Sequence, residues 1–97
     1  MLDINTISKR YFTVKIGNVT LEVEPPQLKA LKQITSLSQS TGDDAITDLA
    51  EAVAMILNKN KNKYKSNKLV EELDIDQMFE ILHQYFDWLS NISKDPN

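Results

Sequence analysis

The segment Ile75–Ile92 constrains the fold of this chain more than any other stretch of its sequence. At about 100° per residue, its apolar side chains fall on two adjoining stripes of one helix, and polar side chains fill the rest of the circumference. The first stripe consists of Ile75, Phe79, Leu82, Phe86 and Leu89. The second stripe consists of Met78, Ile81, Tyr85, Trp88 and Ile92. Together they span about half of the helix surface, more than the ~100° that a helix needs to pack on one core.

A chain of 97 residues forms one domain with a small core, so we expect it to have difficulty covering both stripes. The first stripe, with Phe79 and Phe86, is predicted to pack in the core. The second stripe is predicted to bind a partner, because Trp and Tyr are favoured at interfaces. Two alternatives remain open, since the segment with Leu28 and Leu31 or a second copy of the chain can cover this stripe instead. The predicted partner-binding residues are Met78, Ile81, Tyr85, Trp88 and Ile92.

Two runs of alternating apolar and polar residues predict a β-hairpin over residues 10–24. The turn Gly17-Asn18 fits type II′, because Gly17 adopts a positive φ without steric cost. In the resulting register six apolar residues share one face, in the pairs Ile16 with Val19, Val14 with Leu21 and Phe12 with Val23. A hairpin by itself is only marginally stable, so we expect its apolar face to pack on helices or an edge to pair with another chain.

The sequence predicts that residues 1–97 form a single α+β domain that is mainly helical. Its N-terminal hairpin packs on a small bundle of three helices plus a short helical turn. The remaining segments are an irregular lead-in at 1–9, two helices in 26–58, a Lys/Asn-rich loop at 59–67, a C-terminal helical region at 68–92 and a frayed tail at 93–97. Asp74 and Gln77 are predicted to form a capping box at the start of the last helix.

Five lysines alternate with asparagines between Asn58 and Lys68. We expect a solvated, mobile loop, because such a polar tract cannot bury enough surface to offset its ordering entropy. A phosphate-binding strip is the alternative, although Tyr64 is the single aromatic residue there and arginine is absent.

Residue types that carry out catalysis are sparse in this sequence. Cysteine is absent, which excludes disulfides, thiolate metal sites and thiol nucleophiles. The single histidine, His83, falls on the polar face with Glu80 and Asp87, where a surface histidine is expected rather than a general base. An acidic cluster is better explained by helix capping and solvation than by a divalent cation site; it comprises Glu71, Glu72, Asp74, Asp76 and Glu80. The sequence predicts no enzyme, no cofactor and no metal.

Charge and hydropathy also restrict the partners. No apolar run approaches the ~18–20 residues of a membrane-spanning helix, and no signal-peptide pattern is present at the N-terminus. A formal net charge of −3 disfavours general binding to nucleic acid. We therefore expect neither a membrane nor a nucleic acid as partner.

Five segments spread between residues 9 and 92 carry a family resemblance: RYFTVKI (10–16), EPPQLK (24–29), LNKNK (57–61), LDIDQ (73–77) and YFDWL (85–89). They resemble the tail assembly chaperones of long-tailed phages and prophages of Gram-positive bacteria. The resemblance implies a non-catalytic protein of the host bacterial cytoplasm that binds and shields the tape measure protein during tail morphogenesis. It also implies self-association into a homo-oligomer. The alternative is a small phage regulatory protein that inhibits a host factor by protein–protein binding.

Overall fold

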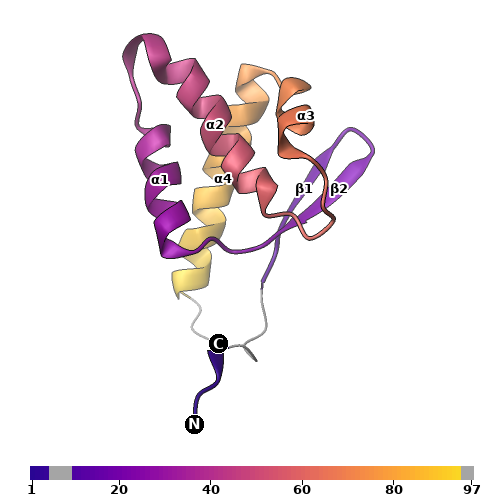
Figure 1. The fold of residues 1–97 in the computed structure, drawn as a ribbon, viewed down its shortest axis with the longest axis vertical. Helices are drawn as coiled ribbons and strands as arrows, with labels where there is room; N and C mark the ends of the chain where they lie inside the picture. Colours follow the sequence, from indigo (N-terminus) through magenta and orange to yellow (C-terminus); the bar gives the residue numbers. More distant parts are fainter. Residues whose placement is uncertain (5–9, 95–97) are drawn as a thin grey trace.

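The computed structural model describes residues 1–4 and 10–94, and in these residues a hairpin precedes the helices (Figure 1). The strands are β1 (Phe12–Ile16) and β2 (Val19–Val23). The helices are α1 (Leu28–Ser38), the 3₁₀ turn η2 (Gly42–Asp44), α2 (Ala45–Asn58), α3 (Ser66–Glu71) and α4 (Ile75–Lys94). This confirms the predicted mainly helical α+β fold. Residues 5–9 of the predicted lead-in and 95–97 of the predicted tail lie outside the described residues, and α4 continues past its predicted end at Ile92.

The hairpin forms in the predicted register. The strands are antiparallel, and the predicted apolar pairs are found at Ile16 with Val19, Val14 with Leu21 and Phe12 with Val23. Gly17 has a φ of 58°, whereas Lys63 is the one non-glycine residue with a positive φ among those described. A positive φ at the first turn position alone matches type II′.

The core is centred on α2, which contacts α1, α3, α4 and β2 (Figure 1). Its buried side chains are Leu49, Ala52, Val53, Ile56 and Leu57. The hairpin contributes Leu21 and Val23, both 0% exposed. Burial of such a side chain is worth roughly 1.5–3 kcal/mol, so packing on the helices stabilises a hairpin that is marginal alone.

The Lys/Asn-rich loop is attached to the outer edge of β2. The Glu24 N–H donates to the Lys59 carbonyl (2.9 Å), and the Lys61 N–H donates to the Glu22 carbonyl (2.9 Å). The Glu22 N–H donates to the Asn62 Oδ1 atom (3.0 Å). Lys59, Lys61 and Asn62 are exposed, as expected of a solvated loop, but these bonds fix residues 59–62 to the strand edge, which corrects the prediction of a mobile loop there.

Asn60 holds the shape of this loop. Its side chain is buried, and its Nδ2 atom donates to the carbonyls of Leu57 (2.7 Å) and Tyr64 (3.0 Å). Its Oδ1 atom accepts from the Tyr64 N–H (2.8 Å). After this turn α3 begins at Ser66, inside the segment that was expected to be loop.

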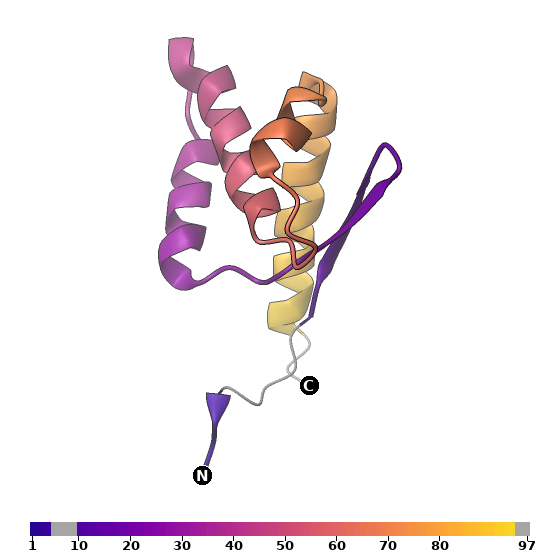
Figure 2. The same ribbon diagram turned by 45° about the vertical axis from the view of Figure 1, so that its right-hand side comes forward.

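The start of α4 is the predicted capping box. The Gln77 N–H donates to Asp74 Oδ1 (2.7 Å), and the Asp74 N–H donates to Gln77 Oε1 (2.9 Å). These reciprocal bonds satisfy two amides at the helix terminus and fix where α4 begins. Figure 2 shows the hairpin beginning beside α4 and diverging from it toward the turn.

Candidate protein-binding surface

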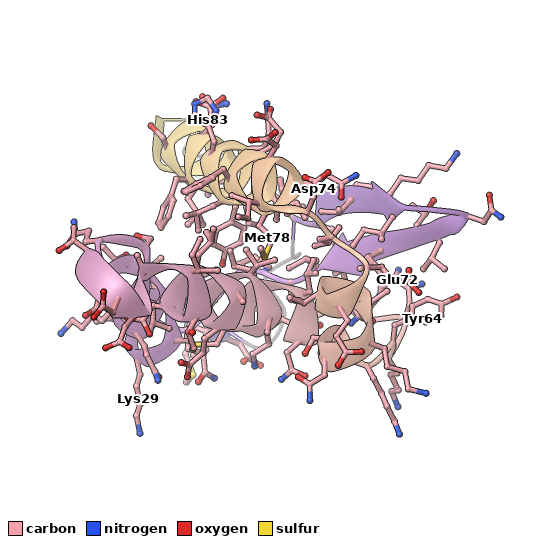
Figure 3. The ribbon with its side chains drawn as sticks, turned by 90° about the horizontal axis from the view of Figure 1, so that it is seen from above. Lys29, Tyr64, Glu72, Asp74, Met78 and His83 are labelled. Carbon is pink, nitrogen blue, oxygen red and sulfur yellow. The ribbon has the colours of Figure 1, made fainter. Side chains whose placement is uncertain are left out.

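Three of the five predicted partner-binding residues are core residues. Met78 is 6% exposed, Ile81 9% and Tyr85 1%. Figure 3 shows Met78 on the side of α4 that faces α2, whereas His83 projects from the opposite side. The prediction of an accessible second stripe is therefore wrong for these residues, because α2 and β1 both pack against α4. Trp88 and Ile92 are half-buried, and Trp88 packs against the same core.

Aromatic rings account for much of this packing. The Phe12 ring lies edge-on to Tyr85 with centroids 5.5 Å apart, and it also contacts Trp88 at 5.6 Å. Tyr85 in turn contacts Trp88 at 5.8 Å and Phe86 at 5.9 Å. Burial raises the pKa of the Tyr85 phenol from 10.0 to about 12. Tyr85 and Trp88, which were predicted to bind a partner, thus pack against the hairpin of their own chain.

The spare apolar surface of α4 lies instead on the first stripe. Ile75 is 45% exposed and Phe79 is 54% exposed, which corrects the prediction that Phe79 packs in the core. Leu82 is buried, and the other members, Phe86 and Leu89, are half-buried. Because residues four apart on a helix are neighbours, Ile75 and Phe79 form one exposed apolar pair.

Ile46 extends the apolar character of this end of the molecule. It lies in the first turn of α2 and is 52% exposed. Both α2 and α4 begin at the same end of the bundle, opposite the end where α1 begins (Figure 1). We call Ile46, Ile75 and Phe79 the apical apolar residues. Sequence periodicity placed Ile75 and Phe79 on an apolar face, but it does not indicate which part of that face remains exposed to solvent.

A groove runs along the contact between β1 and α4. Its larger part, about 460 Å³, lies between the second half of β1 with Gly17 and the start of α4. A second part of about 280 Å³ continues toward Phe12 and Gln84, and the two parts share Val14, Lys15, Glu80 and Ile81. The groove therefore follows the whole of β1.

The charged groups do not assemble into a metal centre within the described part of the chain. No group of three or more His, Asp or Glu side chains among these residues is placed to hold a metal ion. His83 is exposed, and Glu80 accepts a hydrogen bond from Gln84 (2.8 Å). Asp74 is engaged in the capping box, as its position predicts.

The lysines of the loop do not form one strip for phosphate. The Lys61 ammonium lies 4.9 Å from the centre of the Tyr11 ring and 3.4 Å from the Glu22 carboxylate. Lys65 and Lys68 line a separate hollow of about 340 Å³ next to α3. The Lys61 side chain thus interacts with residues of the hairpin region and does not join the other lysines.

No described helix is long and apolar enough to cross a membrane. No protein-family model, curated protein or solved structure matches this chain.

Proposed function

We propose that this chain is a non-catalytic phage tail assembly chaperone that binds and shields the tape measure protein in the host bacterial cytoplasm. The observation that carries the proposal is the exposed pair Ile75 and Phe79 on a helix whose other apolar residues are buried or half-buried. The family resemblance of five sequence segments supports the same function. A guest of largely helical structure with apolar faces suits such a surface, because apolar residues four apart pack along a second helix.

The small size of the exposed pair Ile75 and Phe79 predicts weak binding by each copy. Covering two half-exposed apolar side chains yields roughly 1 kcal/mol each, and association itself costs several kcal/mol. A long guest offers many apolar stretches, and copies linked by the self-association that the resemblance implies can bind several of them at once, which raises the overall avidity. Weak and reversible binding is what an assembly factor needs if the polymerising tail tube is to displace it.

Co-expression with the tape measure protein encoded in the same tail gene cluster tests the proposal. We expect the tape measure protein to remain in the soluble fraction with the chain and to aggregate without it. The chain should co-purify with it in several copies per guest. An insoluble tape measure protein in the presence of excess chain would contradict the proposal. Stable binding to a host protein, with the tape measure protein left unbound, would instead favour the regulatory alternative.

A further inference from the structure

Two small surfaces at opposite ends of the bundle each combine one exposed apolar side chain with charges of a single sign. The first, which we call the α1 end, comprises Leu28, Lys29 and Lys32 at the start of α1. The second, which we call the α2 end, comprises Asp43, Asp44 and Ile46 from η2 and the first turn of α2. Figure 1 shows α1 beginning at one end of the bundle and α2 beginning at the other.

The α1 end is apolar and basic. Leu28 is 67% exposed, and the exposed Lys32 lies one helical turn further on the same side of α1. Lys29 follows Leu28 directly, and Figure 3 shows its side chain projecting away from the body of the molecule. Neither lysine forms an ion pair with any described residue. The first turn of α1 also lacks an acidic residue, although negative charge is favourable at a helix N-terminus.

The α2 end is apolar and acidic. Ile46 is 52% exposed, and Asp43 and Asp44 are exposed just before it in the chain. Asp44 occupies the N-cap position of α2 without a side-chain cap hydrogen bond. Within the described part of the chain, neither carboxylate forms an ion pair. The α2 end therefore offers two carboxylates beside an apolar side chain, which complements the lysines and Leu28 of the α1 end.

We propose that the α1 end of one copy of this chain binds the α2 end of a second copy, in a head-to-tail contact. Leu28 packs against Ile46, and the two lysines pair with Asp43 and Asp44. Charge complementarity identifies the occupant, because each end carries the charges that the other end lacks. A two-fold contact between like ends is disfavoured, since it would place lysines against lysines or aspartates against aspartates. A head-to-tail contact leaves one end of each copy open, so further copies add to form a row.

The contact is small, so each junction should be weak. Two exposed apolar side chains with exposed ion pairs correspond to an interface at the low end of the size range, with a dissociation constant of about 0.1–1 mM. Ile75 and Phe79 belong to α4 and take no part in the junction. The contact involves no guest protein, so it does not depend on the proposed chaperone function.

Removal of one end at a time tests the head-to-tail arrangement. The α1-end variant is Leu28→Gln/Lys29→Gln/Lys32→Gln, and the α2-end variant is Asp43→Asn/Asp44→Asn/Ile46→Gln. All six side chains are exposed, so both variants should fold. Light scattering at about 1 mM protein and about 50 mM salt measures the weight-average mass. We expect wild type to exceed twice the monomer mass and each variant alone to be monomeric.

A mixture of the two variants distinguishes a head-to-tail contact from a two-fold contact. Each variant retains one intact end, so an equimolar mixture should approach the mass of a dimer without exceeding it. The variant Ile75→Gln/Phe79→Gln is the control and should associate like wild type. Salt at about 500 mM should weaken wild-type association by about two- to fivefold, because exposed charges are screened.

Four results would overturn the assignment. Wild type that stays monomeric at about 1 mM would show that the two ends do not bind each other at this strength. Association of either variant alone would indicate a two-fold contact or another surface. A mixture that exceeds the dimer mass, or loss of association in Ile75→Gln/Phe79→Gln, would likewise place the junction elsewhere.

Discussion

The ring of Phe12 meets the ring of Tyr85 edge-on, at 5.5 Å between centroids and an interplanar angle of 75°. This contact joins β1 to the middle of α4, although the two residues lie far apart in the sequence. It explains why the apolar face of the hairpin is covered within the molecule, and why Tyr85 is not accessible to a partner.

A double-mutant cycle measures how strongly this ring pair couples the hairpin to α4. We expect Phe12→Leu and Tyr85→Leu each to lower the free energy of unfolding, because both rings are buried. The double variant should lose less than the sum of the two, by about 0.5–1.5 kcal/mol, which is the usual worth of an edge-to-face pair. Urea unfolding of the four proteins provides the values. Strict additivity would show that the two rings contribute only through their separate burial.

Alkaline pH should destabilise the protein through Tyr85. Burial raises the pKa of its phenol to about 12 in the folded state, against about 10 in the unfolded chain. The stabilisation from the neutral phenol is therefore complete below pH 10 and is lost as the pH rises through 12. Between pH 9 and pH 11, wild type should lose about 1 kcal/mol more unfolding free energy than Tyr85→Phe. Parallel pH dependence of the two proteins would show that the phenol does not titrate in this way.

Removal of the Asn60 side chain should loosen the loop that closes β2. Asn60→Ala leaves the Tyr64 N–H and the carbonyls of Leu57 and Tyr64 without this partner, so we expect a loss of about 2 kcal/mol in unfolding free energy. Asn67→Ala, at an exposed position in α3, is the matched control and should change stability by less than about 0.5 kcal/mol. Similar values for both variants in thermal or urea unfolding would contradict the role given to Asn60.

The features that the sequence predicted correctly are set by local chemistry. Gly17 determines the turn, and the turn determines which strand residues face each other. Asp74 and Gln77 lie three residues apart, so their reciprocal caps depend on nothing beyond one helical turn. The hairpin register and the start of α4 were therefore predictable without tertiary information.

The features that the sequence could not provide depend on which segments meet in space. The two stripes of α4 are equally apolar, and only the positions of α2 and β1 decide that Tyr85 is buried while Phe79 remains exposed. Likewise Asn60 resembles Asn58 and Asn62 in the sequence. Its burial follows from the approach of the loop to β2, a contact between residues far apart in the chain.

Replacement of the exposed pair on α4 tests whether this pair, and not the Tyr85 stripe, binds the guest. In the variant Ile75→Gln/Phe79→Gln, glutamine preserves helix propensity and removes the apolar contact area. Both positions are at least 45% exposed, so the unfolding midpoint should change little. His83→Ala/Asp87→Ala, on the polar face of the same helix, is the control.

The decisive measurement is the affinity of these variants for immobilised tape measure protein, compared with wild type by biolayer interferometry. We expect a loss of at least about tenfold for Ile75→Gln/Phe79→Gln, because two lost apolar contacts are worth roughly 2 kcal/mol. The control should keep wild-type affinity. Wild-type affinity in a folded Ile75→Gln/Phe79→Gln variant would contradict the account.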